Sequence, residues 1–169
     1  MKKFIKTNLL LLIVFAIMLS FAGCGDEYSN NGLHFKLPAY MEEKSYEYAP
    51  IAYGTPGVNF MAHVFLKDII SSELGLSADI SARDYVDEFI EYNLEDVEEY
   101  DLAYDENTQI AILSYIYRYN TEGLEDEFYY HYIVRTERAL YIVTMDCKES
   151  MIDEYKPIFA QWAADIWVE

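Results

Sequence analysis

The chain has 169 residues, of which 53% are hydrophobic and 17% aromatic, and its formal charge is −18 at pH 7. This composition excludes an intrinsically disordered chain, and the length suits one domain with its own hydrophobic core. The acidic balance argues against a nucleic-acid-binding protein, because phosphates attract Lys and Arg. Solubility is the simplest reason for such a charge, and a cationic partner, a basic peptide or loosely held metal ions are the alternatives.

The first residues have the pattern of a secretory signal peptide. Three lysines within residues 1–6 form a basic start, and an unbroken apolar run follows over residues 9–19. A membrane-spanning helix needs about 20 apolar residues, which is more than this run contains. The basic start, the short apolar run and the small residues at its end predict that residues 1–23 are cleaved from the mature protein.

A cysteine follows this run. Phe21-Ala22-Gly23-Cys24 resembles the lipobox of bacterial lipoproteins. The resemblance implies that Cys24 carries a diacylglyceryl group and anchors the protein at the extracytoplasmic face of a bacterial membrane. Two or more acyl chains hold a protein firmly, because each buried methylene contributes about 0.8 kcal/mol. Loss of the three signal lysines leaves nine basic and 30 acidic residues, so the mature charge is −21.

Residues 24–31 are polar and predict a short tether, and residues 32–169 then form a single domain. Within this domain, alternating apolar and polar residues predict β-strands. Before the first helix, strands are expected over residues 32–37, 46–53 and 58–67, with a turn at 54–57. After that helix, strands are expected over residues 97–104, 109–119, 127–135 and 139–147.

Two helices and one long connection complete the pattern. Ser81 begins a helix, since Asp84 stands three residues later in capping-box spacing and an apolar stripe follows. The preceding segment Asp68–Ile80 has weak periodicity and is expected to be a loop, of a length that is often functional. A last helix is predicted from Ser150 to the C-terminus, with a break before Pro157, because proline disrupts a helix interior.

This order of elements predicts an α+β fold, an antiparallel sheet of about six strands with a helix packed on each face. The central runs are apolar on both sides, so both faces of the sheet should be covered. Three segments resemble the PsbP-like family: Phe35-Lys36-Leu37-Pro38, the strand Ala139–Thr144, and the helix pattern Tyr155, Phe159, Trp162 and Ile166. This family includes a photosystem II extrinsic subunit, a eukaryotic Ran-binding relative and bacterial DcrB-like lipoproteins. The resemblance implies an α/β/α sandwich that acts as a binding or assembly module.

Few residues are of the types that carry chemistry. His34, His63 and His131 lie on three different predicted strands, and none has a ligand-spaced neighbour. Neither a metal site nor a cofactor is therefore expected. With Cys24 assigned to the lipid anchor, Cys147 is left without a disulfide partner and is expected to be an inert, half-buried thiol.

Known catalytic motifs are absent from the sequence. It contains no Gly-x-Ser-x-Gly elbow and no Gly-rich phosphate loop, and nothing near Ser71, Ser72 or Ser114 distinguishes these hydroxyls. The acid-rich stretch at residues 95–101 lacks the spacing of a calcium-binding loop, so a solvated sheet edge is the simpler interpretation. We therefore expect a protein that is not an enzyme.

Tyrosines are concentrated on two predicted strands and could provide a binding surface. They are Tyr115, Tyr117 and Tyr119 on one strand and Tyr129, Tyr130 and Tyr132 on the next. Core packing under a helix accounts for most of these rings, and one or two exposed rings could form a docking patch.

Together these observations favour a membrane-anchored, non-catalytic lipoprotein that binds a protein or peptide, with a basic partner as one candidate. The alternatives are a small-molecule or cation binder that uses a cleft under the Asp68–Ile80 loop, and an unrecognised hydrolase. A flat apolar patch ringed by acids would favour the first function. A closed cleft lined with tyrosines and carboxylates would favour the second, and a hydroxyl or thiol hydrogen-bonded to a histidine would favour the third.

Overall fold

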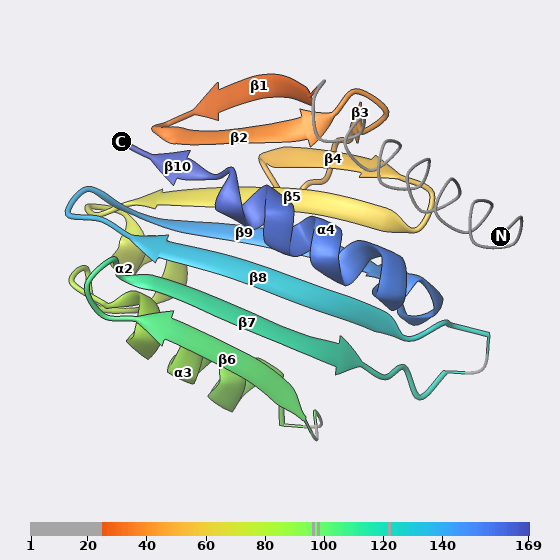
Figure 1. The fold of residues 1–169 in the computed structure, drawn as a ribbon. Helices are drawn as coiled ribbons and strands as arrows, with labels where there is room; N and C mark the ends of the chain where they lie inside the picture. Colours follow the sequence, from red (N-terminus) through yellow and green to blue (C-terminus); the bar gives the residue numbers. More distant parts are fainter. Residues whose placement is uncertain (1–24, 96, 98, 122) are drawn as a thin grey trace, which may run out of the picture.

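A computed structural model describes residues 25–169 apart from residues 96, 98 and 122. The expected signal peptide and the acylated Cys24 lie outside these residues. The chain forms a large antiparallel sheet, with α3 (Ala82–Asn93) on one face and α4 (Ile152–Ala164) on the other, and a small sheet beside it (Figure 1). The predicted α+β fold with a helix on each face is confirmed.

The large sheet has seven strands in the order β3-β4-β5-β9-β8-β7-β6. They are β3 (Glu42–Glu43), β4 (Ile51–Thr55), β5 (Val58–Leu66), β6 (Tyr100–Asp105), β7 (Ile110–Tyr117), β8 (Glu127–Arg135) and β9 (Ala139–Lys148). Strands β6 to β9 form a meander, and the β4–β5 hairpin joins it through the β5–β9 pair. The predicted strands are present within a few residues, except that the weak candidate at 46–53 is replaced by β4.

The small sheet contains β1 (Gly25–Asn30), β2 (Leu33–Pro38) and β10 (Trp167–Val168). The prediction of a polar tether over residues 24–31 is wrong for the part that the structure describes, because β1 pairs with β2 along its whole length. Asn31 and Gly32 have φ angles of 48° and 81°, as the two central residues of a type I′ hairpin turn do. This turn brings β1 and β2 into register, although most residues of β1 are polar.

The segment between β5 and α3 is more ordered than the sequence suggests. It contains α2 (Ile70–Leu74), so Asp68–Ile80 is not the irregular loop that was predicted. The start of α3 is as predicted, because the Ser81 hydroxyl oxygen accepts a hydrogen bond from the Asp84 backbone N–H at 3.0 Å. In the described residues, no helix has the length and apolar character needed to cross a membrane.

The C-terminal helix runs through Pro157, and the predicted break is wrong. A 3₁₀ turn at Glu149–Met151 precedes α4, which then continues to Ala164 before β10 begins. Tyr155 and Phe159, one on each side of the proline, are buried in the same core. Burial of these rings holds the helix continuous despite the backbone hydrogen bond that proline cannot make.

Two hydrophobic cores lie on opposite faces of the large sheet. The α4-side core contains Phe60, Met145 and Phe159, and the α3-side core contains Val86 and Leu113. Both cores are built from residues in the range 25–169, so we expect this range to fold on its own.

Cys147 lies in the α4-side core with no exposed surface, rather than half-buried as predicted. Burial raises the pKa of its thiol to about 12, so the group is the neutral thiol at physiological pH.

Candidate functional site

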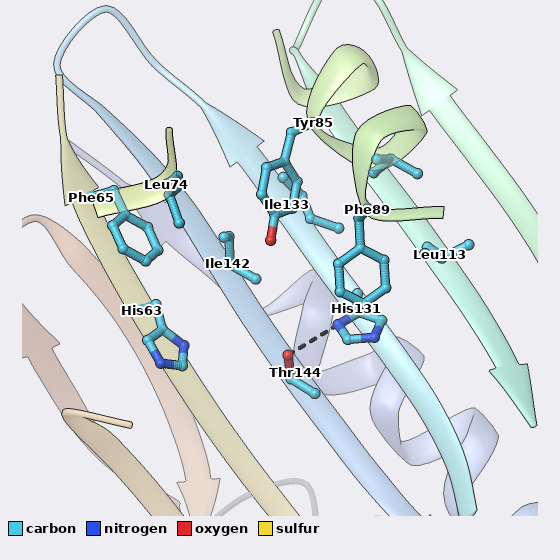
Figure 2. Close-up of a pocket in the computed structure, with 11 residues that line it drawn as sticks. His63, Phe65, Leu74, Tyr85, Phe89, Leu113, His131, Ile133, Ile142 and Thr144 are labelled. Carbon is cyan, nitrogen blue, oxygen red and sulfur yellow. Dashed lines mark hydrogen bonds between the residues drawn. The ribbon is translucent and has the colours of Figure 1, made fainter. Parts of the chain in front are cut away.

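A pocket of about 230 Å³ opens on the α3 side of the large sheet, between α2 and α3 (Figure 2). It is lined by His63, Phe65, Leu74, Tyr85, Val86, Phe89, Leu113, His131, Ile133, Ile142 and Thr144. Most of these side chains are apolar or aromatic, and the polar ones carry hydroxyls or imidazoles. This composition is typical of a site that receives an apolar group and orients it with a few hydrogen bonds.

The floor of the pocket follows from the strand register. Alternate residues of a strand point to the same face of a sheet. In the register of the large sheet, His63 of β5 lies opposite Ile142 of β9, and Thr144 of β9 lies opposite His131 of β8. Three neighbouring strands therefore present side chains to one surface, and Tyr85 of α3 covers part of it (Figure 2).

His131 is the polar centre of this floor. Its Nδ1 lies 3.0 Å from the Thr144 Oγ1, and its Nε2 lies 3.2 Å from the Tyr115 hydroxyl oxygen. Only 7% of the residue is exposed, and burial lowers the pKa of the imidazole to about 4. The ring is therefore neutral at pH 7, with one nitrogen donating and the other accepting.

The rim of the pocket carries the second imidazole. His63 Nε2 lies 2.5 Å from the backbone carbonyl oxygen of Tyr48. Because a carbonyl can only accept, the His63 Nε2 carries the hydrogen in this contact. The His63 ring is nearly parallel to the Phe65 ring, with 6.0 Å between the centroids, so the rim on β5 is aromatic.

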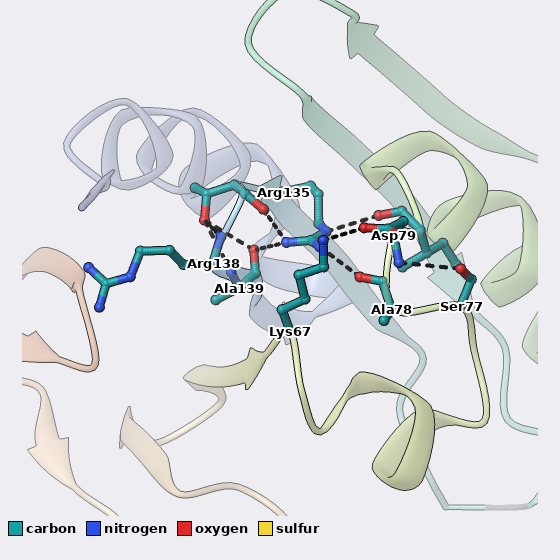
Figure 3. Close-up of polar contacts among 9 residues, drawn as sticks. Lys67, Ser77, Ala78, Asp79, Arg135, Arg138 and Ala139 are labelled. Carbon is teal, nitrogen blue, oxygen red and sulfur yellow. Dashed lines mark hydrogen bonds and ion pairs between the residues drawn. The ribbon is translucent and has the colours of Figure 1, made fainter.

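The wall formed by the Asp68–Ile80 segment is held to the sheet by Arg135 at the end of β8 (Figure 3). The guanidinium Nη2 donates to the Ala78 carbonyl oxygen at 2.8 Å, and Nε donates to the Ile80 carbonyl oxygen at 3.0 Å. Its Nη1 also donates to the carbonyl oxygen of Ala139 at 3.0 Å. One half-buried side chain thus fixes the segment that carries α2.

An ion pair between Lys67 and Asp79 supports the same segment (Figure 3). The hydrogen bond from Lys67 lowers the pKa of the Asp79 carboxyl, which keeps the carboxylate ionised. Both groups are largely exposed to solvent, so the pair contributes less to stability than the Arg135 hydrogen bonds do.

The expected tyrosine surface is divided between the two faces of the sheet. Tyr115 lines up opposite Tyr129 and both lie on the α3 side, whereas Tyr130 and Tyr132 belong to the α4-side core. These rings therefore do not share one face, and core packing accounts for Tyr130 and Tyr132, which was the main interpretation from the sequence. Tyr117 is the most exposed ring of the predicted set on β7, at 37%.

Tyr119 lies just beyond β7 and reaches the same face. Its hydroxyl donates to Glu127 Oε2 at 2.8 Å, and the Tyr129 hydroxyl donates to the same oxygen at 2.7 Å. Both phenol pKa values are raised, that of Tyr129 mainly by burial. The α3 side of the sheet thus carries an aromatic and acidic strip next to the pocket.

The predicted histidines lie on three strands, as expected, and the fold brings two of them together. His63 and His131 both line the pocket, whereas His34 lies on β2 of the small sheet, where its ring stacks on Trp167 at 3.5 Å. In the part of the chain that the structure describes, no group of three or more His, Cys, Asp or Glu side chains is arranged to hold a metal ion.

A histidine bonded to a hydroxyl is the arrangement that would favour a hydrolase, and the His131–Thr144 contact has this form. A general base needs a pKa near the working pH and a group that orients the ring. The pKa of His131 is about 4, and the second ring nitrogen contacts the Tyr115 hydroxyl rather than a carboxylate. The pair is suited to binding a polar atom and poorly suited to removing a proton.

The remaining sequence candidates lie away from the pocket. Ser71 and Ser72 hydrogen-bond to backbone carbonyls of their own segment, and Ser114 is buried on β7. The acid-rich stretch ends in β6, an edge strand of the large sheet, where Asp101 lies 3.3 Å from Lys156. The interpretation of a solvated edge agrees with the exposed side chains of β6.

Sequence reasoning offered a cleft under the Asp68–Ile80 segment as the alternative site, but it did not identify the residues that line the pocket. Its signal is the presence of His131 and Thr144 within strands that are otherwise apolar on both faces. A buried polar residue is more informative than a buried apolar one, because it needs a hydrogen-bond partner.

No protein-family model matches the sequence, and no curated protein matches it. Solved structures share the fold. The solution structure of cyanobacterial PsbP (CyanoP) from Synechocystis sp. PCC 6803 has a TM-score of 0.53 at 12% identity, over 85% of this chain and 92% of that chain. The Ran-binding protein Mog1p of Saccharomyces cerevisiae has a TM-score of 0.50 at 7% identity, over 86% of this chain and 96% of that chain.

A structure from Bacteroides thetaiotaomicron VPI-5482 has a TM-score of 0.54 at 13% identity. It is matched over 86% of this chain and 48% of its own, so this chain spans about half of that protein. The predicted PsbP-like fold is confirmed by these similarities. At such low identities the similarity shows the fold alone, and the function has to be argued from the site.

Proposed function

We propose that this protein is a lipid-anchored, non-catalytic binding module on the extracytoplasmic face of a bacterial membrane, and that its α3-side pocket takes a small apolar or aromatic group. One observation carries the proposal, namely an apolar pocket of about 230 Å³ with a neutral hydrogen-bonding centre at His131. A pocket of this kind favours a small molecule over the flat protein-docking patch expected from the sequence.

The pocket is supported by rigid parts of the fold. Its floor belongs to three paired strands, and its α2 wall is fixed by Arg135 through carbonyl oxygens that lie 55 and 57 residues earlier in the chain. A preformed site loses little conformational entropy when a ligand binds. This rigidity supports specific binding of a group that matches the pocket in shape.

A protein or peptide partner that inserts one side chain is the second candidate. The exposed ring of Tyr117 and the carboxylate of Glu127 lie on the same face as the pocket and could contact the rest of such a partner. A small molecule and a peptide would compete for the same pocket, so a pocket-filling substitution would block both.

The membrane anchor is proposed from the sequence around Cys24. Because β1 begins at Gly25, an acyl group on the preceding residue would hold the small sheet directly at the membrane surface, without a free tether. The substitution Cys24→Ser should move the protein from the membrane fraction to the soluble fraction. A variant that stays in the membrane fraction would show that acylation of Cys24 is not the anchor.

The pocket is tested with phenylbutanol, a neutral aromatic probe, and residues 25–169. Leu74→Trp places a large ring at the pocket wall and should weaken binding by about tenfold or more, as measured by NMR titration. Leu66→Trp is the matched control, because Leu66 is 42% exposed and does not line the pocket. Equal affinity of the two variants, or no binding to the native domain, would contradict the proposed site.

A further inference from the structure

The floor of the pocket continues along β9 to a carboxylate. Asp146 follows Thr144 by two residues, so the two side chains project from the same face of the strand, roughly 7 Å apart along it. Asn59 of β5 and Tyr129 of β8 stand opposite Asp146 in the register. Asp146 therefore lies next to the pocket on the same face of the sheet, beyond the residues that line the pocket.

Asp146 is buried without a cationic partner. The residue is 4% exposed, and the Asn59 Nδ2 donates to its Oδ2 at 2.7 Å. No ion pair joins it to a Lys, Arg or His among the described residues. Lys148, two residues further on the same face, is paired with Glu125 at 2.9 Å. A buried carboxylate with only an amide partner is a costly arrangement in a protein interior.

The groups around Asp146 favour a positive charge. The Tyr129 ring stands across from it on β8 and is parallel to the His131 ring of the pocket floor, with 6.1 Å between centroids. Faces of aromatic rings attract cations. Glu127, which accepts from the Tyr129 hydroxyl, adds a second carboxylate on the same face. The long-range field is also negative, since the charge of the whole chain is −18.

We propose that the α3-side pocket and Asp146 form one binding site for an amphipathic amine, whose apolar body fills the pocket and whose ammonium group lies against the Asp146 carboxylate and the Tyr129 ring. This inference rests on the proposed function of the pocket and names the chemical class of its ligand. The proposed ligand is an organic cation with an apolar body and not a metal ion, because the described residues offer no group of three metal ligands.

The test compares three probes with the same aromatic body on residues 25–169, namely phenylbutylamine, phenylbutanol and phenylbutyrate. Phenylbutylamine should bind at least about tenfold more tightly than phenylbutanol, and phenylbutyrate should bind more weakly than either. Asp146→Asn should reduce the affinity for the amine to that for the alcohol and leave the alcohol unchanged. Asp153→Asn, which removes the same charge from the exposed side of α4, should keep the preference for the amine.

The outcomes separate this inference from the proposed function. Equal affinity for amine and alcohol would overturn the amine site and leave the pocket standing, whereas no binding of any probe would overturn both. A preference for the amine that survives Asp146→Asn would also overturn the inference. In the native domain, independent of any variant, the amine should shift the ring resonances of Tyr129 and the alcohol should not; equal shifts would contradict the site.

Discussion

His131 on β8 and Asp146 on β9 project from the same face of neighbouring strands, and burial drives each of them toward its neutral form. The pKa of His131 is lowered to about 4, and the pKa of Asp146 is raised to about 6. Desolvation is the main cause in both cases. Their contributions to folding stability therefore have opposite pH dependence within the same acidic range.

His131 is predicted to make the fold less stable as the pH falls. Its pKa is below the ordinary value of 6.5, so the unfolded chain binds a proton more readily than the folded one between about pH 6.5 and 4. The lost stability is about 3 kcal/mol. NMR should show an unchanged His131 ring signal from about pH 7 to about pH 5. A titration midpoint near the ordinary value would contradict this.

Asp146 is predicted to act in the opposite direction. Its pKa is raised from 3.8 in the unfolded chain to about 6 in the folded one. The contribution of Asp146 to folding stability is therefore fully present below about pH 3.8 and is lost as the pH rises through about 6. Asp146→Asn should therefore stabilise the domain at pH 7, by up to about 3 kcal/mol, and give little gain at about pH 4. Urea unfolding of both proteins at the two pH values measures this difference. A variant that is less stable at pH 7 would contradict it.

Arg135 is predicted to control the order of the pocket wall. Arg135→Lys keeps the charge but loses the fork that reaches the carbonyl oxygens of Ala78 and Ile80. We expect a loss of about 2 kcal/mol and faster amide hydrogen exchange over residues 77–80. Arg138→Lys, an exposed substitution three residues later, is the control and should change neither. Unchanged exchange in the Arg135 variant would show that the segment is held by other contacts.

Pro157 is predicted to weaken α4. Pro157→Ala restores a backbone N–H that can donate within the helix, so the free energy of unfolding should rise by about 1 kcal/mol or more.

Pro56 is the contrasting position, since it precedes Gly57, whose φ of 82° fits a type II turn. Pro56→Ala should lower stability by about 0.5 kcal/mol. Chemical denaturation measures both changes, and destabilisation by Pro157→Ala would contradict the account of the helix.

Much of the fold was predictable from hydrophobic patterning. Strands such as β8 and β9 are apolar on both faces, which fixes them between two covering layers. The errors have local causes. The signal for β1 was the Asn31-Gly32 pair, a hairpin sequence that is preceded by a mostly polar segment rather than by an alternating apolar one. β10 spans two residues, too short for a periodic pattern.

The site was less predictable than the fold, because it depends on register and on distant contacts. Tyr130 lies opposite Ser114, and this register places it on the face opposite to Tyr115. Sequence alone does not give that offset between two strands. The pocket also depends on Arg135 holding a segment from much earlier in the chain, a contact that no local pattern reveals.

The most direct measurement of the central claim is an intermolecular NOE experiment on residues 25–169 with phenylbutanol. The account predicts contacts between the phenyl protons and the methyl groups of Ile133 and Ile142, which line the pocket. Ile116, which packs against the α4-side core, should show none. Contacts to Ile116 without contacts to Ile142, or no intermolecular contacts at saturating probe, would contradict the claim that this protein binds its ligand in the α3-side pocket.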